Sequence, residues 1–157
     1  MNPFTSAAER GEYNCFGCSP GNKAGLHLEF WEDSGEIISR WNPQEDYEGW
    51  KGVLHGGIQA TLMDETAAWL IFIKLNTAGV TSRLEIKYPK AVFISKGSIS
   101  VRARLISLEN HLATISCTLA DGENKVCAEA TAVYFCFPEK IAREKYHYPG
   151  AEAFYSG

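Results

Sequence analysis

The sequence contains no run of about eighteen apolar residues, so a transmembrane helix is not expected. Its first fourteen residues are polar and include no apolar segment of the kind found in secretory signals. Basic charge is not in excess either, because the net charge is −4 at pH 7, whereas a general nucleic-acid binder needs a basic surface for the phosphate backbone. These absences predict a cytoplasmic protein with neither nucleic-acid nor membrane partners.

Metal-binding and redox signatures are sparse. The five cysteines are an odd number, and without an export signal they favour free thiols in a reducing compartment. Cys15 and Cys18 have the C-x-x-C spacing of a metal knuckle or a redox pair, but no second C-x-x-C, no H-x-x-x-H and no βαβ unit accompanies them. We interpret this pair as structural or incidental, with zinc shared between two chains as the main alternative. The other three are expected to be core thiols: Cys117, Cys127 and Cys136.

The length and composition of the chain fit a single domain. The 157 residues are 45% apolar and 22% charged, which is typical of a globular chain with a core of its own. We expect residues 1–14 to form a loose lead-in and residues 138–157 to form a polar tail with a short helix. Between them, a nearly all-round apolar segment predicts one long buried helix over residues 57–76. Alternation of apolar and polar residues predicts six strands: 26–30, 37–41, 83–88, 99–105, 113–119 and 126–134.

The order of these elements predicts an α+β fold. Two strands, one buried helix and four further strands are most simply arranged as a single domain, residues 1–157, in which a curved antiparallel sheet wraps around the helix. Three alanines, at positions 128, 130 and 132, share one face of the last strand. Their small side chains would allow the helix to lie close against the sheet.

The start of the helix is the first candidate for chemistry. His55-Gly56-Gly57 leads directly into it, and two glycines permit close approaches that side chains would block. The first helical turn also offers unpaired backbone N–H groups and the positive end of the helix dipole, which suit an anion or a developing oxyanion. The alternative is a loop-to-helix junction without a ligand.

Two carboxylates in the apolar helix are the second candidate. Asp64 and Glu65 are adjacent, so they point about 100° apart and cannot face the same place. A buried carboxylate is costly unless it is paired, which leaves two interpretations open. Either these residues reach a solvent edge or cap a neighbouring segment, or one of them is held in a cleft as a base or nucleophile.

The segment from His55 to Asp64, HGGIQATLMD, closely resembles the signature of hot-dog-fold thioesterases of the phenylacetate-pathway type, in the superfamily of 4-hydroxybenzoyl-CoA thioesterase-like proteins. In that family an HGG turn enters the central helix, and a catalytic Asp lies nine residues after the His, as Asp64 does here. Thr81 matches a family position that supports the catalytic water. The resemblance implies a hot-dog fold, a catalytic set of His55, Gly57, Asp64 and Thr81, a CoA or acyl-carrier thioester substrate, and no metal or organic cofactor.

The remaining substrate contacts are less well defined. Many family members carry an Asn or Gln shortly before HGG, whereas this chain has Tyr-Glu-Gly-Trp-Lys at 47–51, so either Glu48 or the backbone takes that role. Gly56 is expected to touch the substrate, and Trp50 is the best candidate to contact an acyl group. Residues 83–104 contain six basic residues against one acidic residue, a strip that could meet the phosphates of coenzyme A or could be an ordinary solvated strand face. Its candidate contacts are Lys87, Lys90 and Arg102.

A geometric argument predicts an oligomer. Gly57 and Asp64 are seven residues apart, which is about 10 Å along a helix. An oxyanion donor must lie near 3 Å from the reacting oxygen, and the base must also be close to the carbonyl carbon. Two antiparallel helices across a two-fold axis would bring Gly57 of one chain opposite Asp64 of the other. We therefore predict a homodimer with shared active sites, assembled further as a dimer of dimers.

Three functions fit this site. The leading prediction is hydrolysis of an acyl-CoA or acyl-carrier thioester, in which Asp64 activates water or attacks directly while the Gly57 N–H polarises the carbonyl. A non-catalytic acyl-CoA sensor would use the same pocket, but the sequence shows no DNA-binding segment of a regulator. A dehydratase of the same fold would need an active-site His paired with an acid on the helix, and the helix contains no His.

Overall fold

The computed structural model describes residues 2–155 and contains the predicted order of two strands, one long helix and four strands. The elements are α1 (Thr5–Glu9), β1 (Glu29–Asp33), β2 (Glu36–Trp41), η1 (Glu45–Tyr47), α2 (Gly56–Lys74), β3 (Gly79–Lys87), η2 (Ile94–Lys96), β4 (Ile99–Glu109), β5 (Leu112–Ala120), β6 (Val126–Cys136), α3 (Glu139–Tyr146) and η3 (Ala151–Phe154). None of the helices within the described residues combines the length and apolar character needed to cross a membrane.

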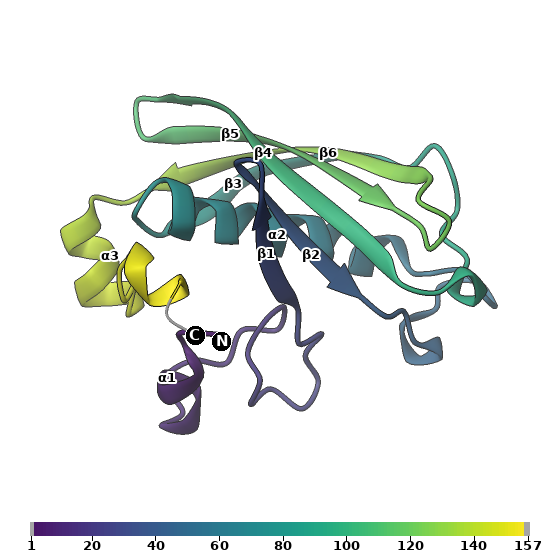
Figure 1. Cartoon of the computed structure of the whole chain (residues 1–157), viewed down its shortest axis with the longest axis horizontal. Coiled ribbons are helices and arrows are strands. Elements are labelled where there is room, and N and C mark those ends of the chain that lie inside the picture. Colours follow the sequence, from purple (N-terminus) through teal and green to yellow (C-terminus); the bar gives the residue numbers. More distant parts are fainter. Residues whose placement is uncertain (1, 156–157) are drawn as a thin grey trace.

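The six strands form one antiparallel sheet in the order β1-β2-β4-β5-β6-β3. The sheet arches over α2, which lies along its inner side (Figure 1). The α+β prediction of a curved antiparallel sheet around one central helix is therefore confirmed. Strand β3 lies at one end of the sheet and pairs with β6, and its outer edge has no partner strand among residues 2–155.

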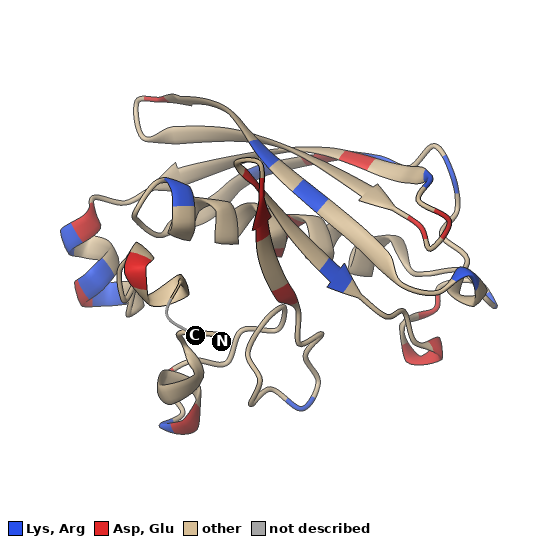
Figure 2. Cartoon of the chain, viewed as in Figure 1, with Lys and Arg blue, Asp and Glu red and all other residues tan. Residues whose placement is uncertain are grey.

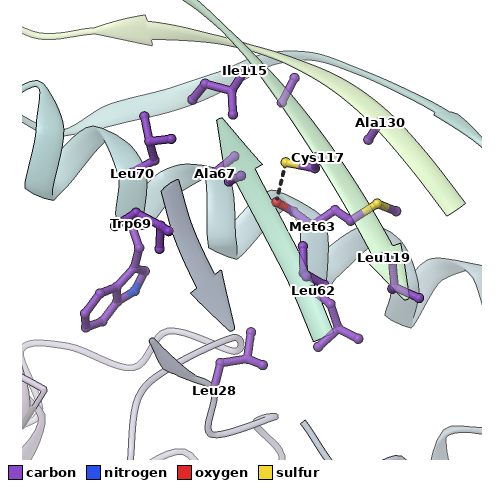
Figure 3. Close-up of a cluster of buried hydrophobic side chains, with 14 of the residues drawn as sticks. Leu28, Leu62, Met63, Ala67, Trp69, Leu70, Ile115, Cys117, Leu119 and Ala130 are labelled. Atoms are coloured by element: carbon purple, nitrogen blue, oxygen red, sulfur yellow. Dashed lines mark hydrogen bonds between the residues drawn. The ribbon is translucent and has the colours of Figure 1, made fainter. Parts of the chain in front are cut away.

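The core lies between α2 and the sheet because the apolar side chains of both point there. Leu62, Met63 and Leu70 of α2 are fully buried, and they face inward-pointing strand residues that include Ile115 and Cys117 (Figure 3). The three alanines of β6 are also buried, as expected for a helix that lies close to the sheet. Truncating one such leucine to alanine would cost about 2–5 kcal/mol of stability.

The prediction that residues 1–14 form a loose lead-in is wrong. Thr5–Glu9 form α1, and Phe4 is only 2% exposed. Its ring stacks on Tyr13 at 4.3 Å between centroids and packs against Phe72 and Phe154. This aromatic contact joins the N-terminal segment to α2 and to the C-terminal segment, which a one-dimensional periodicity cannot reveal.

The predicted strand over residues 26–30 is also wrong in its first half. His27 has a φ of 54°, a left-handed conformation that interrupts an extended chain, and β1 begins only at Glu29. Leu26 and Leu28 are both buried, so the alternating pattern was a signal of burial rather than of a strand. The Leu28 N–H donates to the Gly17 carbonyl at 2.9 Å, which ties this segment to the preceding loop.

The C-terminal segment contains the expected short helix, α3, followed by η3. Tyr148 is buried between them, and its hydroxyl donates to the Phe72 carbonyl of α2 at 2.7 Å. The tail is therefore packed against the end of α2 and does not form an independent coil. Residues 156 and 157 of the predicted tail, and residue 1 of the predicted lead-in, lie outside the described residues.

Candidate active site

The HGG turn is held by a small backbone hairpin that precedes it. The Gly49 N–H donates to the Val53 carbonyl, and the His55 N–H donates to the Tyr47 carbonyl, each at 2.9 Å. His55 then caps α2, because its Nδ1 accepts the Gly57 N–H at 2.9 Å. A Cβ at Gly57 would lie only 3.1 Å from that nitrogen, so glycine is the residue that fits without displacing the imidazole.

This cap changes the expected source of the oxyanion donor. The Gly57 N–H, which was predicted to polarise a substrate carbonyl, donates its hydrogen bond to the His55 imidazole in this structure. The Gly56 N–H has no hydrogen-bond partner among residues 2–155. The first turn of α2 therefore offers one unpaired backbone donor at the positive end of the helix dipole.

Two hydroxyl groups hold the Asp64 side chain in place. Thr81 Oγ1 donates to Asp64 Oδ1 at 2.8 Å, and the Tyr134 hydroxyl donates to the same oxygen and to the Asp64 backbone carbonyl. Thr81 and Tyr134 are directly opposite each other in the β3–β6 pair, with a β-bulge beginning just after Thr81. The predicted pair of Asp64 and Thr81 is thus brought together by the sheet edge.

Tyr134 was missed by the sequence analysis. It shares the buried face of β6 with the three alanines, and the alternating pattern predicted only that it belongs to this strand. The missed signal is its hydroxyl, since a buried phenol normally finds a polar partner. Burial raises the pKa of the Tyr134 phenol well above its ordinary value, and the Asp64 charge adds to this shift, so the hydroxyl stays protonated and donates.

Glu65 occupies a different environment from its neighbour. Its two carboxyl oxygens both lie 3.4 Å from Cys15 Sγ, on the side of α2 that faces the N-terminal loop. Burial, with a smaller contribution from Cys15, raises the pKa of Glu65 to about 8. At neutral pH this carboxyl therefore tends to hold its proton, which makes it a poor candidate for a general base.

Two cavities flank the HGG turn. The larger, of about 580 Å³, is lined by residues that include Trp50, His55, Gly56 and Lys90, and the smaller, of about 350 Å³, is lined by residues that include Glu48 and Gly57. Trp50 is 85% exposed, so its indole is available at the mouth of the larger cavity. Asp64 lines neither cavity of its own chain.

Gln59 is a second residue that the sequence analysis missed. It lines the larger cavity, is 4% exposed, and donates through Nε2 to the Leu54 carbonyl at 3.2 Å. Its Oε1 is buried and has no hydrogen-bond partner in the described part of the chain. Since an unsatisfied buried acceptor costs about 1–3 kcal/mol, this oxygen is suited to accept a donor from a bound molecule.

The three candidate residues of the predicted basic strip lie in different places in the structure. Arg102 lies on β4 and pairs with Asp33 at 3.3 Å and Glu36 at 3.1 Å, which stand on either side of the β1–β2 turn. Acidic and basic residues both occur on the strands of the sheet (Figure 2). Lys87 is exposed on β3 and lines neither cavity at the turn. Of the three predicted phosphate contacts, only Lys90 is placed beside HGG.

Comparison with known proteins identifies a family. A family model described as the thioesterase superfamily matches residues 51–128, which include HGG, α2 and Thr81. A Saccharolobus solfataricus protein named "Putative esterase SSO1253" is 27% identical over 119 residues, covering 75% of this chain and 77% of that protein. The chain belongs to the thioesterase superfamily.

Solved structures show the same fold. The phenylacetic acid degradation-related protein of Ralstonia eutropha JMP134 matches with a TM-score of 0.66 at 20% identity, covering 85% of this chain and 99% of its own. The protein smu.793 of Streptococcus mutans UA159, solved with acetyl CoA bound, matches with a TM-score of 0.63 at 20% identity over 70% of this chain and 88% of its own. These matches identify the fold as the hot-dog fold of thioesterases, as the sequence resemblance implied.

Proposed function

We propose that this protein hydrolyses acyl-CoA thioesters and that Asp64 is its catalytic residue. The observation that supports this most strongly is the Asp64 carboxylate, positioned by Thr81 and Tyr134 on a helix that opens with His55-Gly56-Gly57. Membership of the thioesterase superfamily favours thioester cleavage. The binding of acetyl CoA by the Streptococcus mutans protein of the same fold favours a CoA ester over an acyl-carrier substrate.

The hydrogen bonds of Asp64 support different roles for its two carboxylate oxygens. Both side-chain donors act on Oδ1, and no partner is recorded for Oδ2 among residues 2–155. Thr81 and Tyr134 thereby fix the orientation of the carboxylate, while Oδ2 remains available. Oδ2 either takes a proton from the attacking water or attacks the thioester carbonyl itself.

The start of α2 would stabilise the negative charge that develops on the thioester oxygen. The Gly56 N–H can donate directly, whereas the Gly57 N–H can do so once the His55 imidazole turns aside. Gly56 and Trp50 lie on the cavity that would receive the acyl thioester, with Lys90 at its rim for a coenzyme A phosphate. Glu48 is engaged by Lys51 at 3.5 Å, so the backbone of the turn is the better candidate for positioning the thioester.

We further propose that each active site is shared between two chains. Helix α2 is continuous from Gly56 to Lys74, so Gly57 and Asp64 are separated by about 10 Å along one axis. The unpartnered edge of β3 could pair with the same edge of a second chain, which would place the two α2 helices side by side and antiparallel. A homodimer is the minimal assembly of this kind, and a dimer of dimers remains our proposal for the full assembly.

A panel of acyl-CoA esters tests the proposed function. Purified protein is incubated with each ester, and the free thiol of released coenzyme A is measured over time. We expect turnover of at least one ester by the native chain and almost none by Asp64→Asn. Saturable binding of the esters without release of thiol would contradict the proposal and would identify a non-catalytic acyl-CoA sensor.

A further inference from the structure

The C-x-x-C loop lies directly against α2 at Glu65. The Sγ atoms of Cys15 and Cys18 and a carboxyl oxygen of Glu65 all lie within 4.8 Å of one another. Cys15 Sγ is 3.4 Å from each Glu65 oxygen. A tetrahedral zinc ion with ordinary Zn–S and Zn–O bond lengths separates its sulfur and oxygen ligands by about 3.6 Å, so this spacing already matches a coordination edge.

Gly17 makes this approach possible. A Cβ at Gly17 would lie 2.6 Å from Glu65 Cγ and 2.7 Å from the carboxyl group, so any side chain there would push Glu65 away from the loop. Backbone hydrogen bonds hold the loop in position, from the Ser19 N–H to the Cys15 carbonyl at 3.1 Å and from the Leu26 N–H to the Phe16 carbonyl at 2.8 Å. The three donor atoms are therefore brought together by the fold.

A polar group also contacts one of the two sulfurs. The Tyr13 hydroxyl lies 3.0 Å from Cys18 Sγ. Hydrogen bonds of this kind surround metal-bound thiolates and orient them. Cys18 Sγ thus has an outer contact of the kind found at metal knuckles, in addition to the spacing of the pair.

The cluster contains acidic groups and no balancing base. Among residues 2–155, no lysine, arginine or histidine forms an ion pair with Glu65, whose recorded hydrogen bonds are with Cys15 Sγ. Two thiolates and a carboxylate would bring three negative charges into a largely buried site, which is strongly unfavourable without a cation. Without a metal the cluster therefore stays partly protonated, in agreement with the protonated Glu65 described above, and a divalent cation would displace these protons and balance the charge.

We propose that Cys15, Cys18 and Glu65 bind a divalent transition-metal ion of the zinc class. Two thiolates and one carboxylate select such a soft-to-borderline ion over Mg²⁺ or Ca²⁺. Cys15 is partly exposed, so its side of the cluster leaves a fourth position to water. The sequence analysis expected no metal because it found only two ligands, and Glu65, distant in sequence, is the third. This site is separate from the proposed thioester chemistry, although the ion would fasten the N-terminal loop to α2 one residue after Asp64.

Cobalt binding tests the proposal without relying on enzymatic activity. The reduced full-length protein is freed of metal with a chelator and titrated with Co²⁺. We expect one ion per chain, with near-ultraviolet thiolate-to-cobalt charge-transfer absorption and visible bands of four-coordinate cobalt, and displacement by Zn²⁺. Cys15→Ser and Cys18→Ser should each weaken binding by more than the roughly 10-fold loss typical of an outer-contact substitution, and should reduce the charge-transfer band.

Two further variants keep both thiols in place. Glu65→Gln removes the third ligand, and Gly17→Ala displaces it without changing any ligand, so both should weaken cobalt binding while retaining charge-transfer absorption at higher Co²⁺ concentration. Cys127→Ser is the matched control, because that thiol is buried on β6 away from the loop and its hydrogen bond to the Lys125 carbonyl can be kept by serine. Circular dichroism and thermal unfolding confirm that each variant is folded.

Several outcomes would overturn the inference. The inference would be rejected if the reduced native protein showed no charge-transfer absorption after addition of Co²⁺. It would also be rejected if the charge-transfer bands survived in the Cys15→Ser/Cys18→Ser double variant. Equal cobalt affinity of native protein, Glu65→Gln and Gly17→Ala would reject the three-ligand site. A Cys15–Cys18 disulfide after purification in air, combined with no cobalt binding after reduction, would identify a redox pair instead.

Discussion

Asp64 and Glu65 are neighbours in the sequence but belong to different environments. Asp64 faces the β3–β6 edge, where two hydroxyl groups donate to its carboxylate. Glu65 faces the N-terminal loop, where its contacts are thiols and its pKa is raised to about 8. The angle of about 100° between adjacent helical residues separates the two sides. One helix therefore holds two adjacent carboxyl groups in different surroundings, the first suited to the catalytic role that we propose and the second to the metal site that we propose.

The difference lies in the donors that each side supplies. Thr81 and Tyr134 offer O–H groups that stabilise a negatively charged oxygen, so the surroundings of Asp64 fit the catalytic role that we propose for it. The partners of Glu65 are thiols, which are themselves acids. A negative charge on Cys15 disfavours a second negative charge on Glu65 and adds to the effect of burial on its pKa. The comparison predicts that the two carboxylates will respond very differently to the same chemical change.

The largest expected effect is that of amide substitution at each position. Asp64→Asn should lower kcat for thioester hydrolysis by about 10²- to 10⁴-fold, the usual range for loss of a general base, while the protein remains folded. Glu65→Gln should lower kcat far less, because that carboxyl does not reach the reacting atoms. Release of coenzyme A measures both rates. Equal losses in the two variants would remove the distinction drawn between the carboxylates.

The second effect tests whether Asp64 works with the turn of a partner chain. Asp64→Asn and Gly57→Val chains are co-expressed with different tags, and the mixed dimer is purified. One of its two sites carries both lesions, whereas the other combines native Gly57 and native Asp64, so activity should return to as much as half of the native value. Each parent homodimer should remain nearly inactive.

As a control, tandem-tag purification confirms that the measured sample is an intact dimer with one chain of each kind. If Gly57 and Asp64 of one chain formed the site, every site in the mixed dimer would carry one lesion and activity would stay low. That result would indicate that one chain supplies both Gly57 and Asp64 to each active site.

The fold was largely predictable because its signal is local. Helix α2 was expected over residues 57–76 and observed as Gly56–Lys74, and the alternating patterns of β4, β5 and β6 located those strands. The N-terminal segment was not predictable, since the burial of Phe4 depends on Phe72 and Phe154 far along the chain. Long-range packing of this kind leaves no periodic trace in the sequence.

The residues of the candidate site also fall into a predictable and an unpredictable group. Motif spacing located His55, Gly57, Asp64 and, by resemblance, Thr81. Tyr134 and the Glu65–Cys15 contact depend on strand register and loop placement, which spacing does not encode. The assignment of Arg102 to a phosphate depended on charge alone, and its actual partners lie on a hairpin that charge counting could not place.

The third effect compares the two glycines of the turn. A Cβ at Gly57 would lie 3.1 Å from His55 Nδ1 and must displace the imidazole cap, whereas a Cβ at Gly56 would lie at an ordinary 3.6 Å from the Tyr88 ring. Gly57→Ala should therefore reduce kcat by about 10-fold or more, since it disturbs the donors at the helix start. Gly56→Ala should reduce it several-fold less. An effect of Gly57→Ala on KM alone would indicate uniform substrate binding instead.

The smallest expected effect is that of Tyr134→Phe. The substitution removes the hydroxyl that donates to Asp64 Oδ1 but keeps the ring, so the core should retain its packing. Thr81 still donates to the same oxygen at 2.8 Å, so the carboxylate should stay in place while its orientation becomes less strictly fixed. We therefore expect kcat to fall by no more than about 10-fold, which corresponds to about 1.4 kcal/mol, with KM nearly unchanged.

A merely structural role for Tyr134 would give a different result. Thermal unfolding would then show a lower midpoint, and kcat measured well below that midpoint would match the native value. Thr81→Val is the matched comparison, because it removes the other donor from an exposed position at the sheet edge. The double variant should lose more activity than the two single losses combined, since Oδ1 would then have no donor and the carboxylate would be free to rotate. A double variant no worse than either single one would show that these hydroxyls do not act together on Asp64.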